Sequence, residues 1–382
     1  MTAPRAEPAP RRAPEAARAA LAGHLPSLDG VRGLAILLVL FHRFDLYPET
    51  SSVSRVLARL CDLGWVGVQL FFVLSGFLIT GILLDSKGSA NYFAAFFMRR
   101  ALRILPLYYA TLVVGLILVP LAMGEPSRAG DEPLLWCFLS NWPTQEHSVF
   151  PHFWSLAVEE QFYWVWPFVV YALDARKLSW LCGALAAGAL VVRIGVLAAG
   201  LNPEQVYTWT ICRMDALANG AALAALFRMS ATREWLARFR SWIAAATLAL
   251  VLAAFVLTNR YERIGSAGQT LGYTVLALAF TVLVGAAALG EIEKRGFAVR
   301  FFSLPPLRTL GKYSYAAYIF HVAIHHTLVK YWVRIEREPT LLGALGYAAV
   351  GIVLSLLAAF ASYQLFERHF LALKRRFAVR AH

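Results

Sequence analysis

Long stretches of apolar residues, separated by short polar segments, run through almost the whole chain. A helix that crosses the hydrocarbon core of a bilayer needs roughly 20 mainly apolar residues. About ten segments approach this length, which predicts an all-α integral membrane protein with a bundle of about ten transmembrane helices. The predicted spans are 31–48, 64–84, 104–123, 152–173, 178–199, 209–227, 241–258, 268–290, 311–330 and 341–366.

Basic residues predict the orientation of these spans. With ten spans and a cytoplasmic N-terminus, 25 of the 36 Lys and Arg fall in inner segments and 9 in outer segments. Because Lys and Arg stay preferentially on the cytoplasmic side, this split predicts that both termini are cytoplasmic. The predicted domains are a disordered cytoplasmic tail at 1–24, a membrane domain at 25–370 and a basic cytoplasmic tail at 371–382.

Composition supports a membrane protein, and the inner or plasma membrane is its expected location. Of the residues, 59% are apolar and only 15% are charged, and the mean hydropathy is +0.57. A soluble domain is nearer one quarter charged. The net charge of +13 is explained first by topology, so nucleic acid is not an expected partner. The four cysteines are widely spaced and form no zinc pattern, which predicts no structural metal.

Ionisable side chains within the first span are candidates for a functional site, because they are costly inside a bilayer. Arg32 lies at the cytoplasmic end, and His42 lies about 15 Å further along the helix. Asp45 follows His42 by three positions, which places the two on one helical face. A carboxylate that is hydrogen-bonded to one imidazole nitrogen fixes the tautomer of the ring and leaves the other nitrogen free to act as a base. The alternative is that His42 packs at the outer interface.

Three arginines open the third span, and two acids open the fourth. Arg99, Arg100 and Arg103 carry planar cations that suit phosphate groups, although plain anchoring at the cytoplasmic face is the alternative. In the fourth span, Glu159 shares a helical face with Ser155, which predicts that Glu159 points into the bundle. The neighbouring Glu160 is predicted to point elsewhere. Small residues at 64, 67, 75 and 76 in the second span predict close helix packing.

The ninth span carries a polar stripe. Ser314, Tyr318, His321 and His325 recur at i, i+4, i+7 and i+11. Two histidines four residues apart can bind a metal, but no HExxH motif accompanies them. The stripe therefore predicts hydrogen-bonding groups that line an internal cavity, and no metal site is predicted.

Taken together, these blocks resemble the integral-membrane acyltransferase 3 family, which includes O-acetylases of lipopolysaccharide and peptidoglycan and acyltransferases of macrolides and nodulation factors. The resemblance extends from about Leu25 to Phe370 and rests on five blocks in the family's order. The blocks are 28–33 with His42, 67–77, 99–104 with Pro106 and Tyr108, 154–159 with Phe162 and Tyr163, and Gly311 with Ser314, Tyr315, Tyr318 and His321.

The resemblance implies transfer of an acyl group from acyl-CoA, with acetyl-CoA the expected donor, to a hydroxyl of a carbohydrate or glycosylated acceptor. It implies that Arg100 and Arg103 bind the CoA phosphates and that Arg32 and His42 are essential. We therefore expect Arg32 and Arg99 to join the donor site, and His42 to act as general base. Asp45 is expected to fix the tautomer of His42, and Glu159 is expected either to position the acceptor or to assist proton transfer. Ser314, Tyr315, Tyr318 and His321 are expected to bind substrate or the oxyanion.

One spacing departs from the family pattern. Ten residues usually separate the Arg and His of the first span, whereas nine separate Arg32 from His42. A step of eleven returns nearly to the same helical face, and a step of ten falls about 80° short. Either the helix is distorted here, or the two residues act from different angles.

A transporter or exporter of a lipid or saccharide is the alternative function, since a bundle with buried charges suits both classes. The sequence shows no obvious internal repeat of the kind that many transporters carry. The acceptor and the oligomeric state stay open at this point.

Overall fold

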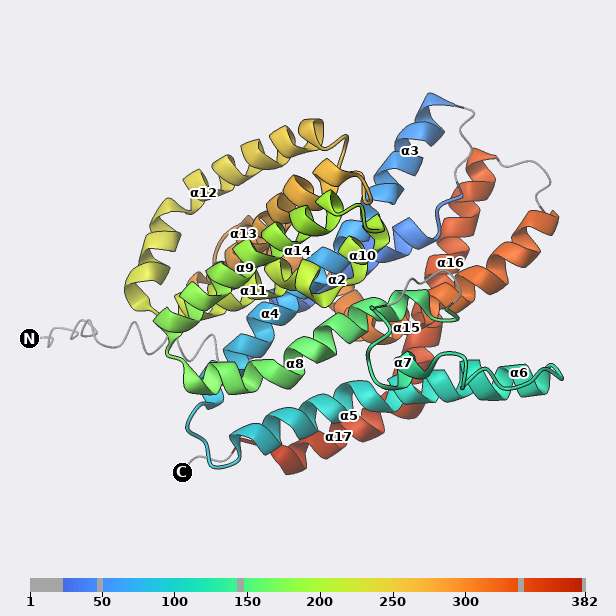
Figure 1. The fold of residues 1–382 in the computed structure, drawn as a ribbon, viewed down its shortest axis with the longest axis horizontal. Coiled ribbons are helices and arrows are strands. Elements are labelled where there is room, and N and C mark those ends of the chain that lie inside the picture. The colour runs from blue at the N-terminus through green and yellow to red at the C-terminus, as the bar shows by residue number, and fades with distance from the viewer. Residues whose placement is uncertain (1–22, 47–50, 143–147, 336–339, 380–382) are drawn as a thin grey trace, which may run out of the picture.

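The computed structural model describes residues 23–46, 51–142, 148–335 and 340–379, and within them it is helical without strands (Figure 1). Each predicted span overlaps a helix of 18 residues or more. These helices are α2 (Pro26–Arg43), α4 (Val66–Ser86), α5 (Tyr92–Val113), α8 (Trp154–Ala172), α9 (Ala175–Ala198), α11 (Thr210–Phe227), α12 (Ser230–Leu257), α13 (Tyr273–Glu293), α15 (Pro305–Ile335) and α16 (Leu341–Ser362).

Shorter helices join or extend the long ones. They are α3 (Ser52–Asp62), η1 (Leu63–Trp65), η2 (Val114–Leu118), α6 (Val119–Ala122), α7 (Pro133–Trp136), η3 (Pro151–Phe153), α10 (Pro203–Thr208), η4 (Gly268–Gly272), α14 (Phe297–Phe302), η5 (Tyr363–Glu367), α17 (Arg368–Leu373) and η6 (Lys374–Phe377). Because α3, η1 and α4 follow one another without a break, the helical segment that contains the second predicted span begins at Ser52.

Six helical segments of the described chain are long and apolar enough to cross a bilayer, so the protein is a multi-pass membrane protein. They are Ser52–Ser86, Tyr92–Ala122, Ala175–Ala198, Ser230–Leu257, Gly268–Glu293 and Leu341–Phe377. The helices α2, α8, α11 and α15 carry more polar groups and fall outside this set. The count of ten spans stays a prediction.

Helix α12 shows that the outer surface of the bundle is apolar. This helix lies along one flank of the molecule (Figure 1). Only 6% of its most apolar stretch of 18 residues is buried by the rest of the protein. Its exposed side chains include Trp242 and Val256, which are more than three-quarters exposed. An apolar surface of this extent is stable where lipid covers it.

Glycines bring four helices into backbone contact. A Cβ atom on Gly311 of α15 would lie 1.8 Å from the carbonyl oxygen of Asp29 in α2, and one on Gly33 would lie 2.0 Å from that of Leu307. The same holds between α4 and α11, where a Cβ on Gly76 would lie 2.0 Å from the carbonyl oxygen of Leu217. Small residues therefore permit the close helix approach that the sequence predicts for the second span.

The two ends of the described chain lie at the same end of the bundle. Gly23 and Val379 line one cavity, and the Asn91 side chain donates a hydrogen bond of 2.9 Å to the carbonyl oxygen of Ala378. The predicted tail at 1–24 lies outside the described residues except for Gly23 and His24. Which side of the membrane this end faces stays a prediction.

The contact between α2 and α15 can be tested with Gly311→Ala. The added methyl overlaps backbone rather than a side chain, so we expect destabilisation of about 1–3 kcal/mol or more. Thermal unfolding of the purified protein in detergent measures the loss. Gly183→Ala in α9 is the matched control, because a Cβ at Gly183 has open space around it. Equal melting temperatures for the two variants would contradict this account of the packing.

Candidate active site

A cavity of about 720 Å³ lies between α2, α4, α5, α8 and α15, close to the described ends of the chain. Its open end is lined by exposed residues, among them His24 and Val379. Its inner end is lined by buried residues, among them Phe72, Ser155 and Tyr318. The cavity therefore runs from the surface into the centre of the bundle.

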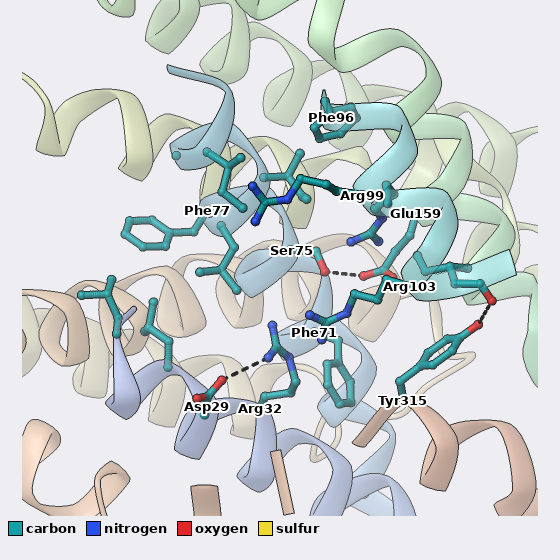
Figure 2. Close-up of a pocket in the computed structure, with 18 of the residues that line it drawn as sticks. Asp29, Arg32, Phe71, Ser75, Phe77, Phe96, Arg99, Arg103, Glu159 and Tyr315 are labelled. Carbon is teal, nitrogen blue, oxygen red and sulfur yellow. Dashed lines mark hydrogen bonds and ion pairs between the residues drawn. The ribbon is translucent and has the colours of Figure 1, made fainter. Parts of the chain in front are cut away.

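Four arginines predicted to bind the donor line this cavity. Arg99, Arg100 and Arg103 come from α5, and Arg32 comes from α2 on the facing wall. Figure 2 shows Arg32, Arg99 and Arg103 directed toward a common space from these two helices. The three arginines of α5 lie within about one and a half helical turns of one another. Their side chains therefore enter the cavity at about the same level.

Six cationic side chains and four carboxylates line the cavity, and three ion pairs join some of them. Arg32 Nη1 lies 3.3 Å from Asp29 Oδ1. Arg228 Nε donates to Asp85 Oδ1 at 2.8 Å. The third pair joins α5 to α8 and is described next.

The Arg100 guanidinium is held by α8. Its Nε atom lies 3.4 Å from Glu160 Oε1, and its central carbon lies 3.6 Å from the centre of the Tyr163 ring. Arg100 and Glu160 are both largely buried. The prediction that Glu160 points away from the site is therefore wrong: Glu160 lines the cavity together with Glu159. Adjacent residues of a helix differ by about 100°, and a cavity this wide accommodates both.

Glu159 is the cavity carboxylate whose described neighbours include no cation in ion-pair contact. Its Oε1 atom accepts a hydrogen bond of 2.5 Å from the Ser75 hydroxyl of α4, drawn in Figure 2. The sequence indicated packing as the role of Ser75, whereas the structure makes it a hydrogen-bond donor within the site. A hydroxyl side chain in the middle of an apolar helix was the available signal.

At the inner end of the cavity, hydroxyl groups from α8 and α15 meet. Ser155 Oγ and the Tyr318 hydroxyl lie 2.6 Å apart, and the Tyr318 hydroxyl also lies 3.1 Å from the carbonyl oxygen of His152. Ser314 lines the cavity nearby, as does Tyr315, whose hydroxyl donates to the carbonyl oxygen of Ile104 at 2.8 Å. The prediction that the polar face of the ninth span lines a cavity is thus confirmed for its first half.

His321 lies beyond the cavity. Its ring packs against the ring of His152 with 4.9 Å between centres, and its Nδ1 atom lies 2.5 Å from the carbonyl oxygen of Tyr318. The side chain is buried and does not line the cavity. The stripe thus continues past the cavity to His325, which is half-buried and forms a hydrogen bond of 2.8 Å with the Tyr347 hydroxyl.

His42 also lies outside the cavity, near the other end of α2. Helix α2 is regular from Pro26 to Arg43, so it contains no distortion that would bring His42 to the face of Arg32. The side chains of Arg32 and His42 therefore leave α2 in different directions. The helical spacing from which the pairing with Asp45 was predicted does not apply, because α2 ends at Arg43. The carboxylate 3.8 Å from His42 Nδ1 belongs to Asp62 of α3.

The cavity thus offers cations at one level, apolar and aromatic walls such as Phe71 and Leu78, and a carboxylate with hydroxyl groups at its inner end. Such a site suits an elongated molecule with an anionic head and a reactive group at the far end of an apolar arm. Among the described residues, no group of three or more His, Cys, Asp or Glu is arranged to hold a metal ion.

An all-helical membrane protein with such a cavity fits a membrane acyltransferase, and comparison with known proteins supports this class. The family model described as Acyltransferase domain matches residues 25–363, so the chain belongs to the acyltransferase 3 family. This membership does not favour the transporter alternative. No solved structure matches the chain significantly.

Several curated relatives are named as O-acetyltransferases. The chain is 28% identical to the peptidoglycan O-acetyltransferase OatA of Listeria monocytogenes over 79% of its own length and 49% of the relative. It is 31% identical to the putative peptidoglycan O-acetyltransferase YrhL of Bacillus subtilis over 79% of its length and 48% of the relative. It is 26% identical to a putative O-acetyltransferase of Staphylococcus aureus over 81% of its own length and 52% of the relative. The chain therefore spans about half the length of these relatives.

The ion pair between Arg100 and Glu160 makes a prediction about stability. Removing one partner of a buried pair leaves an uncompensated charge, so Glu160→Leu and Arg100→Met should each destabilise the protein, by about 3–5 kcal/mol. The double variant should lose much less than the sum of the two. Thermal unfolding in detergent of the four proteins of this cycle provides the measurement. Additive losses would contradict a direct pairing.

Proposed function

We propose that this protein transfers the acetyl group of acetyl-CoA to a hydroxyl group of a cell-wall glycan at the plasma membrane. One observation carries the proposal: the arginine-lined cavity leads to a carboxylate and hydroxyl groups in the middle of the bundle. The names of the curated relatives support an O-acetyl product and a peptidoglycan acceptor.

The donor is proposed to enter from the end of the bundle where the arginines lie. CoA carries a pyrophosphate and a 3′-phosphate, which match the forked guanidinium groups of Arg99 and Arg103. Its pantetheine arm is uncharged and fits against the apolar walls near Phe71 and Leu78. The thioester then lies toward Ser155 and Glu159. This orientation requires the open end of the cavity to face the cytoplasm, as the distribution of basic residues predicts.

The proposed chemistry is a direct transfer. The acceptor oxygen attacks the thioester carbonyl, a C–O bond forms, and the C–S bond breaks to release CoA. His42, at the acceptor end of α2, takes the proton of the hydroxyl as general base. Glu159, which has no ion-pair partner among the described residues, delivers a proton to the departing thiolate. The hydroxyl groups of Ser314, Tyr315 and Tyr318 are proposed to hold the substrate or the oxyanion.

A labelling assay tests this function. Purified protein in proteoliposomes receives radiolabelled acetyl-CoA on the side of the arginine cavity and a muropeptide acceptor on the other side. We expect label in an ester that mild alkali releases. Wild-type protein that transfers no label to any hydroxyl acceptor would overturn the proposal, and an Arg103→Gln variant with unchanged labelling would exclude the proposed donor site.

The separate places of His42 and the arginines predict different defects. His42→Ala should reduce the transfer rate about 10²–10⁴-fold, the usual contribution of a positioned general base, and should leave the affinity for CoA unchanged. Arg103→Gln should weaken CoA binding about tenfold or more. Equilibrium binding of CoA and single-turnover transfer measure the two effects. Loss of CoA affinity in His42→Ala would place this residue in the donor site instead.

A further inference from the structure

The C-terminal segment folds back along the helix that carries the arginines. In Figure 1, α17 lies beside α5, and η6 continues from α17 against the same helix. The hydrogen bond from Asn91 to the carbonyl oxygen of Ala378 fixes the end of this segment at the start of α5. Residues 371–377, which composition alone assigned to a basic tail, are therefore ordered helix at the wall of the site.

Within this segment, one basic residue faces the cavity and its two neighbours do not. Lys374 lines the cavity, as does Val379. Arg375 and Arg376 are exposed and do not line it. The preference of basic residues for the cytoplasmic face accounts for any of the three equally. That preference does not explain why Lys374 lies among the arginines of the site.

Charge pairing around the cavity leaves an excess of cations. Arg32, Arg100 and Arg228 each have a carboxylate partner. For Arg99, Arg103 and Lys374, the described residues provide no carboxylate within ion-pair distance, and the Lys374 ammonium lies close enough to the arginines of α5 to interact with them. Cations of like charge repel one another strongly where water is limited. A bound polyanion would relieve this repulsion.

We propose that Lys374 binds a phosphate group of the donor and that the C-terminal segment forms part of the donor site. The proposal rests on the proposed function, because it takes CoA as the ligand. The ammonium acts as a point charge with three donors, alongside the forked groups of Arg99 and Arg103. Three cations then face the three phosphate groups of CoA, two in the pyrophosphate and one on the ribose.

Equilibrium binding of CoA to the full-length protein in detergent tests the proposal without relying on turnover. Lys374→Gln should weaken binding about tenfold, the usual effect of losing one hydrogen bond to a charged group. Arg375→Gln is the matched control, since it removes the same charge from the same short helix outside the cavity. It should bind CoA as wild type does. Lys374→Arg should restore most of the affinity.

Dephospho-CoA identifies which phosphate Lys374 contacts. If Lys374→Gln weakens CoA binding but not dephospho-CoA binding, then Lys374 contacts the 3′-phosphate. If it weakens both equally, then Lys374 contacts the pyrophosphate. Either result supports the proposal. Melting temperatures of all variants, compared with wild type, separate loss of binding from loss of the fold.

The possible failures are distinguishable. Wild-type protein that binds neither CoA nor acetyl-CoA would overturn the proposed function, and the present inference would fail with it. Wild-type protein that binds CoA, together with Lys374→Gln and Arg375→Gln variants of equal affinity, would overturn this inference alone. In that case the donor site would consist of the arginines of α2 and α5 without the C-terminal segment.

Discussion

The backbone contact between α2 and α15 is the constraint on which the site depends. Glycines at 33 and 311 let the two helices approach until backbone touches backbone. As a result, Arg32 from one helix and Tyr315 from the other line the same cavity. A wider separation of α2 and α15 would move Arg32 and Tyr315 apart. The arginines of α5 would then no longer share one cavity with both of these residues. The same few small residues therefore determine both the packing of α2 against α15 and the arrangement of the side chains that line the cavity.

Periodicity and residue type predicted much of this site. The arginine block of α5, Glu159 and the first half of the α15 stripe all line one cavity, because each lies on a long helix whose faces the sequence fixes. Lys374 could not be predicted this way. Its position depends on a C-terminal segment that turns back along α5, and local sequence does not encode the direction of that turn. The predicted direction of Glu160 was wrong because the cavity is wider than one helical face and takes in both adjacent acids.

The spacing between Arg32 and His42 illustrates how a single residue changes an interpretation. With nine residues between them, a distorted helix and a regular helix were both possible. The helix is regular, so the residue on the Arg32 face near the C-terminal end of α2 is Arg43, eleven positions on. Its neighbour His42 turns toward α3, where Asp62 lies. The contact with Asp62 could not be predicted from helical spacing, because Asp62 reaches His42 from another helix.

The closed inner end of the cavity has a consequence for the membrane itself. Ser155 and Tyr318 are joined by a hydrogen bond, and the packed rings of His152 and His321 lie behind them. A donor that fills the cavity therefore meets a barrier rather than a continuous channel. If the function proposed above holds, the Ser155–Tyr318 contact must open far enough for the acceptor hydroxyl to reach the thioester, while CoA itself stays on its own side of the bilayer. Only the two-carbon unit changes compartment.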